Sequence, residues 1–223
     1  MTAIYKIFLE NFAAFLAAMT VTLKLTFVSL VLATLIGLVF AFLKISGNRL
    51  LYGVAQLYIT IIRGTPLIVQ LMFLYFGIIK IVVLPAFWAG SLALAIHSGA
   101  YIAEIFRGTI QSIDRGQMEA ARSLGMSYSL AMRRIILPQA FKRAIPPLGN
   151  QFIIGLKDSS LVAYLGVAEI YGTALYAQAA NFQPFETYMV AGFYYLVLVI
   201  IFTYLVNKLE LKLNVGKDGV ASK

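Results

Sequence analysis

The sequence contains no cysteine, one histidine and few charged residues. Without cysteine it has no disulfide, thiolate nucleophile or cysteine metal ligand, and a single histidine, His97, makes a histidine metal site implausible. The sequence also lacks the phosphate-binding pattern G-x-x-x-x-G-K-[ST] and the protease and hydrolase patterns H-E-x-x-H and G-x-S-x-G. These absences argue against ATP binding by this chain, a metal centre and a hydrolytic enzyme.

Apolar residues dominate the 223-residue chain. They make up 61% of it, the mean hydropathy is +0.87, and only 12% of residues are charged. Soluble domains are about half apolar and about a quarter charged, so this composition predicts an all-α, polytopic membrane protein. The net charge of +9 does not indicate nucleic-acid binding, because the basic residues cluster in the gaps between apolar stretches.

The apolar stretches predict about five transmembrane helices within a single domain, 1–223. These stretches cover about residues 25–43, 66–84, 86–106, 148–165 and 188–206. Residues 1–22 interleave apolar and polar side chains, which is typical of an amphipathic helix at the membrane surface. Residues 50–62 are apolar but too short to span a bilayer, so we expect an interfacial or half-buried helix there.

The distribution of charge predicts the orientation. Most of the 18 Lys and Arg residues lie in the 44–63 turn, in the segment 107–147 and in the tail 208–223. Because cytoplasmic loops carry an excess of basic residues, these three segments are expected in the cytoplasm, with the N-terminus outside and the C-terminus inside.

The segment 107–147 is a basic, polar, helix-forming island between apolar stretches. Asp114 is a suitable N-cap, and Gln117 three residues later predicts a capping box. Gly125 suits the left-handed position that follows a helix. A short helix from Arg115 to Leu124 is therefore expected, followed by a sharp turn.

A second helix of the island is expected to be capped by Ser127 or Ser129 and to end near Pro138. Helix, glycine turn and helix together make a shape that can enter a groove on another protein. The alternative is a solvated basic loop that only enforces topology.

The island resembles the EAA loop of permease subunits of bacterial ABC importers. The matching residues are Glu119-Ala120-Ala121, Gly125, Ile135 and Leu137-Pro138 in the family's spacing. The flanking sequence resembles the polar amino-acid uptake branch of this family, which includes histidine, glutamine and arginine permeases. It comprises Arg63-Gly64-Thr65-Pro66-Leu67, Ala100-Tyr101-Ile102-Ala103-Glu104, Arg107-Gly108, Gly116-Gln117, Pro138-Gln139-Ala140, Pro146-Pro147-Leu148-Gly149-Asn150 and Lys157-Asp158-Ser159-Ser160-Leu161. Ser159 departs from the usual Thr but keeps the hydroxyl.

The resemblance implies a type I ABC importer permease in the bacterial inner (plasma) membrane, with its EAA loop in a cleft of a separate ATPase subunit. It implies that this chain is no enzyme and binds no cofactor, since ATP and Mg would be bound by that ATPase. Further implied partners are a second permease subunit, an extracytoplasmic solute-binding protein, membrane lipid and an amino-acid substrate. The residues implied in coupling to the ATPase are Gly116, Gln117, Glu119, Ala120, Ala121, Arg122, Gly125, Leu137 and Pro138.

Ionisable and hydroxyl residues within the apolar stretches are candidates for a substrate pathway, since such groups usually face a partner or a cavity. These residues are Glu104, Lys157, Asp158, Ser159 and Ser160, together with Glu169 in the mixed stretch 166–187 that follows the fourth apolar stretch. Each also has a structural interpretation. Glu104 and Arg107 can form an i,i+3 ion pair, and Lys157 and Asp158 can neutralise each other. Glu169 is the weaker candidate and is expected near the outer mouth.

A secondary transporter or channel is the alternative function, with Glu104, His97 and Asp158 as a relay. It would give the EAA loop no purpose. An intramembrane enzyme has little support, given the absent motifs. The identity of the amino acid and the choice between homodimer and heterodimer stay open at this point.

Overall fold

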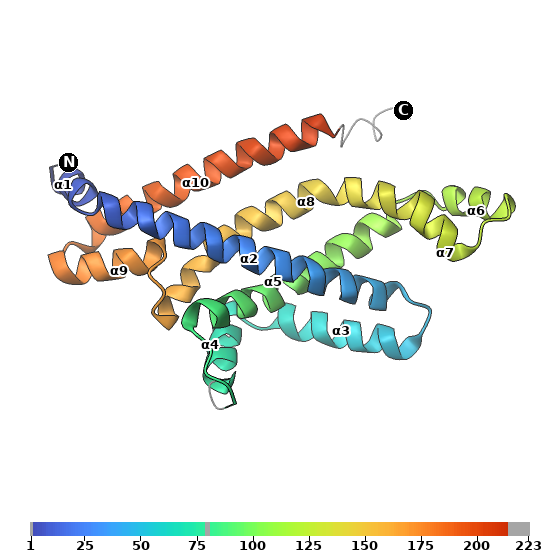
Figure 1. Cartoon of the computed structure of the whole chain (residues 1–223), viewed down its shortest axis with the longest axis horizontal. Coiled ribbons are helices and arrows are strands. Elements are labelled where there is room, and N and C mark those ends of the chain that lie inside the picture. The colour runs from blue at the N-terminus through green and yellow to red at the C-terminus, as the bar shows by residue number, and fades with distance from the viewer. Residues whose placement is uncertain (1, 79–80, 214–223) are drawn as a thin grey trace.

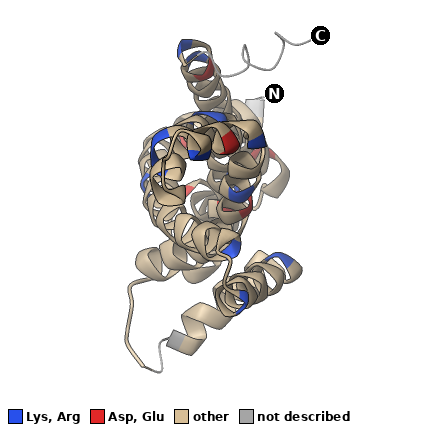
Figure 2. Cartoon of the chain, turned by 90° about the vertical axis from the view of Figure 1, so that its right-hand side faces the viewer, with Lys and Arg blue, Asp and Glu red and all other residues tan. Residues whose placement is uncertain are grey.

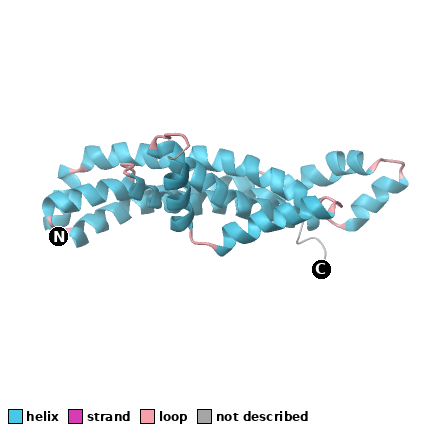
Figure 3. Ribbon diagram, turned by 90° about the horizontal axis from the view of Figure 1, so that it is seen from below, coloured by secondary structure: helices cyan, strands magenta, loops and turns pink. Residues whose placement is uncertain are grey.

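The computed structural model describes residues 2–78 and 81–213, and over these residues the chain is helical with short connections (Figures 1 and 3). This confirms the predicted all-α fold. In chain order the elements are α1 (Thr2–Glu10), α2 (Phe12–Ile45), α3 (Arg49–Gly64), α4 (Leu67–Ile78), α5 (Ala86–Gln111), α6 (Arg115–Ser123), α7 (Tyr128–Ala131), the π-helix η1 (Met132–Ile136), α8 (Leu137–Asp158), the 3-10 helix η2 (Ser159–Leu165), α9 (Ile170–Asn181) and α10 (Pro184–Lys212).

Three helices, α2, α5 and α10, are long and apolar enough to cross a membrane. A fourth crossing is possible if α3 and α4, which meet at a bend of 109°, are counted as one broken span. The predicted number of about five exceeds this count. The difference lies in α8, which carries Lys142, Arg143, Lys157 and Asp158 and does not have the composition of an apolar span.

The helices α2 and α5 pack along each other at the centre of the bundle (Figure 1). At their contact, a Cβ on Gly37 would lie 2.5 Å from the Ile102 side chain and 3.1 Å from the backbone nitrogen of Ala103. Only glycine permits this approach, and small residues allow close helix packing in membranes. Ala33, Ala41 and Ile102 are buried around it.

The N-terminal prediction was wrong in extent. The separate amphipathic helix is only α1, and α2 begins at Phe12, well before the predicted start at residue 25. Aromatic packing explains the early start, since the rings of Phe8 and Phe15 both stack on Tyr194 of α10, at 5.7 and 4.9 Å between centroids. This packing holds the first turns of α2 in the bundle rather than at the membrane surface.

The predicted half-buried helix at residues 50–62 is confirmed, whereas the predicted span 66–84 was wrong. The first segment lies in α3, which packs into the bundle through Ala55 and Ile59, and the Tyr58 hydroxyl donates to the carbonyl of Ile96 at 2.6 Å. The second segment holds only the 12 residues of α4. A 12-residue helix rises about 18 Å, too little to cross a bilayer alone.

The position of Arg63 corrects the predicted 44–63 turn. Arg49 opens α3 and Arg63 lies on its last turn, so the two residues are at opposite ends of a 16-residue helix. The guanidinium of Arg63 lies 5.3 Å from the ring centroid of Tyr101, in the middle of α5. Arg63 therefore does not belong with the basic residues around Lys44.

The second helix of the basic island does not end near Pro138. It continues through η1 into α8, and Pro138, Pro146 and Pro147 all lie inside this helical run. The predicted fourth span, 148–165, is the second half of α8 followed by η2, and the mixed stretch 166–187 contains α9.

The last helix, α10, is longer than the predicted span 188–206 and includes the first residues of the predicted basic tail. Residues 214–223 of that tail lie outside the described residues. The elements α6 and α7 project from one end of the bundle, and among the charged residues seen from this end Lys and Arg outnumber Asp and Glu (Figures 1 and 2). By the positive-inside rule this end is cytoplasmic.

Candidate functional site

The projecting helix α6 begins with the predicted cap. The Asp114 carboxylate Oδ1 accepts the backbone N–H of Gly116 at 2.6 Å. The predicted capping box does not form, because Gln117 turns away and its Oε1 accepts from Gln139 Nε2 of α8 at 3.3 Å. Gln117 therefore connects α6 to α8.

The end of α6 confirms the predicted glycine turn. Gly125 has φ +83°, its N–H donates to the carbonyl of Arg122, and the N–H of Met126 donates to the carbonyl of Ala121. These two bonds define a Schellman motif. Arg122 Nη1 also donates to the carbonyl of Met126 at 2.9 Å, so the Arg122 side chain reinforces the turn.

The exposed side of α6 carries small and polar residues with one large apolar residue. Glu119 and Ala120 are exposed, whereas Ala121 is buried against the rest of the island. Leu124, at the C-terminal end, is 84% exposed. A shallow groove of about 380 Å³ runs along this surface and is lined by Asp114, Gly116, Gln117, Ala120, Ala121, Leu124 and Ile135. Sequence reasoning missed Leu124, although a lone leucine at the end of a polar helix is a detectable signal.

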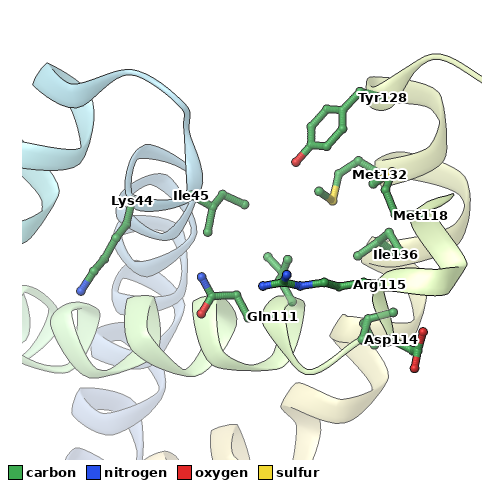
Figure 4. A pocket seen from close by; sticks show the side chains of 11 residues that line it. Lys44, Ile45, Gln111, Asp114, Arg115, Met118, Tyr128, Met132 and Ile136 are labelled. Carbon is green, nitrogen blue, oxygen red and sulfur yellow. The ribbon is translucent and has the colours of Figure 1, made fainter. Parts of the chain in front are cut away.

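The helix α6 is seated on a small apolar cluster at the cytoplasmic end. Ile113, Ile136 and Ala140 are its buried members, with Met118 and Met132 packed against them. Beside the cluster lies a cavity of about 720 Å³, open between the end of α2 and the α6–α7 pair (Figure 4). The 11 residues that line it are Lys44, Ile45, Ile110, Gln111, Ile113, Asp114, Arg115, Met118, Tyr128, Met132 and Ile136.

Glu104 forms the predicted ion pair with Arg107 and a second one that was not predicted. Arg107 Nη2 and Nε lie 2.8 and 3.0 Å from Glu104 Oε2, and Lys44 Nζ of α2 pairs with Oε1. All three side chains are at most 30% exposed. Both carboxylate oxygens are thus occupied by cations, and the cluster joins the cytoplasmic ends of α2 and α5.

Residues Lys157 to Ser160 lie at the junction of α8 and η2. Lys157 is exposed, Asp158 and Ser160 are half-buried, and Ser159 is buried with its hydroxyl donating to the carbonyl of Leu156 at 2.7 Å. Within residues 2–78 and 81–213, Lys157 and Asp158 form no ion pair with each other.

Glu169 is fully buried and caps α9 instead of lining an outer mouth. Its Oε1 accepts the N–H of Gly172 at 2.7 Å, and its Oε2 accepts from the hydroxyls of Thr22 and Tyr195. Glu169 therefore joins α2, α9 and α10. The six pathway candidates fall into three separate groups rather than one site.

A polar contact within the bundle was missed altogether. Gln70 Oε1 of α4 lies 2.9 Å from His97 Nδ1 of α5, and Gln70 Nε2 donates to the carbonyls of Ile62 and Thr65. No local sequence signal connects Gln70 with His97, which is 27 residues away along the chain.

Comparison with known sequences decides the family. The family described as binding-protein-dependent transport system inner membrane component matches residues 33–215. The chain belongs to this family. Like its relatives, it is a multi-pass protein of the inner membrane with the helical architecture of type I ABC importer permeases.

Individual relatives of this inner membrane component cover nearly the whole chain. This chain is 38% identical over 201 residues to the arginine transport system permease protein ArtQ of Bacillus subtilis, and the match covers 89% of this chain and 92% of the relative. It is 37% identical over 197 residues to the glutamine transport system permease protein GlnP of Escherichia coli K12, covering 87% and 90%.

Solved structures agree with the fold of this inner membrane component. A crystal structure of an amino acid ABC transporter with histidines matches with a TM-score of 0.86 and 42% identity, covering 92% of this chain and 96% of the other. An inward-facing MetNI methionine ABC transporter matches with a TM-score of 0.80 at 19% identity, and this likeness concerns the fold alone.

Proposed function

We propose that this chain is the membrane-spanning subunit of an ATP-driven importer of polar amino acids, and that α6 couples it to a separate ATPase subunit. The family and the names of its relatives, which include arginine and glutamine permeases, support the transport role and the substrate class. The geometry of α6 supports the coupling role.

The exposure of Leu124 is the observation that carries the coupling proposal. Large apolar side chains along the bundle face lipid, so their exposure needs no protein partner. Leu124 lies outside the apolar spans, on the projecting cytoplasmic element, and is still 84% exposed. Tyr128 and Leu130 of the adjoining α7 are also large, apolar and exposed, and a group of exposed apolar residues rimmed by polar ones marks a protein contact.

The surroundings of Leu124 fit insertion into a cleft. Ala120 keeps the exposed side of α6 slim, and Glu119 is free to make polar contacts with the ATPase. Gly125 and Arg122 close the turn, so the tip presents a compact end. Gly116 begins α6 with its N–H on Asp114, Gln117 connects α6 to Gln139 of α8, and Leu137 and Pro138 open α8.

The partners follow from the same proposal. ATP and Mg are bound by the ATPase subunit, and this chain binds no cofactor. A second permease subunit completes the pathway, and a solute-binding protein delivers the amino acid on the outer side. Within this chain, Asp158, Ser160 and Lys157 are the better candidates for a substrate pathway. Glu104, Ser159 and Glu169 already have their polar atoms occupied.

Transport by reconstituted vesicles tests the proposal. The chain is co-expressed with candidate ATPase and solute-binding subunits, and uptake of labelled arginine and glutamine is measured with and without ATP. Uptake that requires ATP is expected. Uptake that persists without ATP and follows a proton gradient would instead establish the secondary-transporter alternative.

A matched pair of leucines tests the role of Leu124. Leu124→Asp is expected to abolish co-purification of the ATPase while the permease remains inserted, because a charge replaces the apolar contact. Leu211→Asp is the control, since Leu211 is 80% exposed at the far end of α10. Equal co-purification of both variants would contradict docking through α6.

A further inference from the structure

The helical run from Tyr128 to Asp158 contains one turn of different pitch. Over Met132–Ile136 the backbone is a π-helix, and the N–H of Leu137 donates to the carbonyl of Met132, five residues back instead of four. A π-turn is equivalent to an α-helix with one inserted residue, and such turns are rare and frequently occur at functional sites.

The spacing of the buried residues along this run shows the inserted residue. On the α8 side the buried residues are four positions apart, at Ala144, Ala140 and Ile136, and the next buried residue, Ala131, is five positions before Ile136. Because each residue turns an α-helix by about 100°, the extra residue rotates α7 by about that angle relative to a regular continuation of α8. The π-turn therefore sets the direction in which α7 and the attached α6 point.

Pro138 provides a reason for the wide turn. Proline has no N–H, and in a regular α-helix its ring clashes with the carbonyl four residues earlier, here that of Arg134. A wider turn moves this carbonyl away from the ring. The backbone angles at Met132 and Leu137 stay in the right-handed helical region, so the turn is formed without a left-handed residue.

The two sides of the π-turn have different surroundings. On the α8 side, Arg143 Nη1 donates to the carbonyl of Ser112 at 2.7 Å, which fixes α8 to the end of α5. On the other side, the 720 Å³ cavity separates Tyr128 and Met132 from Lys44 and Ile45 of α2 (Figure 4). The α6–α7 pair therefore has room to move toward α2 once the Gln117–Gln139 hydrogen bond opens, whereas the base of α8 does not.

We propose that the π-turn Met132–Ile136 is the point at which the α6–α7 pair moves relative to α8, and that Pro138 is the positioning residue that maintains it. This proposal rests on the proposed coupling function. Pro138 then needs no contact with the ATPase. The α6–α7 pair moves relative to α8 about the π-turn instead of moving rigidly with the bundle.

A regularised helix tests the proposal. Deleting Arg134, which is exposed, together with Pro138→Ala removes the inserted residue and restores a four-residue step from Ala131 to Ile136. Both buried faces keep their register. In the full complex we expect co-purification of the ATPase to be retained and ATP-driven uptake to fall about tenfold, the size of effect typical of changes along a coupling network.

Arg134→Ala is the control, because it removes the same charge without removing the residue, and wild-type uptake is expected. Full uptake by the regularised variant would overturn the proposal. If the wild-type chain does not co-purify with an ATPase subunit, the proposed function itself is overturned, so the two failures are distinguishable.

Distances between spin labels test the joint in the wild-type helix and do not depend on the folding of a deletion variant. The chain has no native cysteine, so pairs can be placed at Ser129 with Lys208 and at Lys142 with Lys208, all of them exposed. The pairs share one label and differ only in the side of the π-turn. Labelled chains are diluted with unlabelled ones so that each distance is measured within one chain. When ATP binds to the complex, the distance between the labels of the Ser129 pair is expected to change more than that of the Lys142 pair. Equal distance changes in both pairs would mean that α7 and α8 move as one rigid helix, which would refute the proposal.

Discussion

Two breaks between helices, an inner one between α3 and α4 along the side of the bundle and an outer one between α6 and α7 at its projecting end, satisfy their free backbone groups in different ways. The helices α3 and α4 meet at Thr65-Pro66 with a bend of 109°. The helices α6 and α7 meet at a sharp turn through Gly125. In both places the ends of helices leave backbone groups without intrahelical partners.

The outer break satisfies its backbone groups locally. The Gly125 and Met126 N–H groups bond to carbonyls of the preceding helix, and the Ser127 hydroxyl accepts the N–H of Leu130 at 3.3 Å. The inner break uses a side chain from the next helix instead. Gln70 Nε2 donates to the carbonyls of Ile62 and Thr65 at 2.7 and 3.0 Å.

The difference follows from the solvent. In hydrocarbon an unsatisfied backbone group costs several kcal/mol, so the inner break needs a protein partner for its carbonyls. Gln70 supplies that partner and, through His97, connects α3 and α4 to α5. At the outer break water is available, so the turn needs only its own backbone and caps. Its remaining side chains stay free for another protein.

Replacing Gln70 should have the largest effect on stability. Gln70→Ala removes donors to two carbonyls and the Thr65 hydroxyl, and the acceptor for His97. Hydrogen bonds between membrane helices contribute roughly 0.6 kcal/mol each, so a loss of about 2 kcal/mol is expected. Thermal unfolding of the detergent-solubilised chain measures this loss.

Gln56→Ala is the matched control, because among the described residues Gln56 donates only to Thr60, within the same helix α3. If both glutamine variants unfold at the same temperature, the inner break does not depend on a side chain from α4, and the contrast between the two breaks disappears.

The two breaks also differ in how far the sequence predicts them. The outer break depends on neighbouring residues, and local signals predicted the glycine turn at Gly125, which is confirmed, and a cap at Ser127 or Ser129, which the structure places at Ser127. The inner break depends on Gln70 and His97, which are brought together by packing. The apolar pattern did not predict the bend between the two helices, and α3 and α4 were predicted as an interfacial or half-buried helix and a separate span.

Long-range pairing limits the prediction of the other polar groups in the same way. The pairing of Glu104 with Arg107 follows from their i,i+3 spacing, whereas the pairing with Lys44 joins residues 60 positions apart. Pro138 was interpreted as the end of a helix because a proline usually ends one. The chain widens one turn instead, a solution that no local residue pattern distinguishes from a stop.

The turn at Gly125 should be the next most sensitive position. A non-glycine residue in the left-handed region costs about 1–2 kcal/mol, so Gly125→Leu should distort the α6 tip and reduce co-purification of the ATPase while the chain stays inserted. Gly125→Asn should be milder, since asparagine tolerates this region. Wild-type co-purification and uptake with Gly125→Leu would show that the outer break does not need its glycine.

The smallest effect is expected at the N-cap of α6. Asp114→Ala removes the acceptor for the Gly116 N–H and should destabilise α6 by about 1 kcal/mol, whereas Asp114→Asn keeps a capping oxygen. Faster amide exchange limited to residues 115–123 is expected for the alanine variant only, because the outer break is stabilised locally. If exchange also accelerates in α5 and α8, α6 is coupled to the bundle beyond its Gln117 and Ile113 contacts, and the two breaks are less independent than their hydrogen bonds indicate.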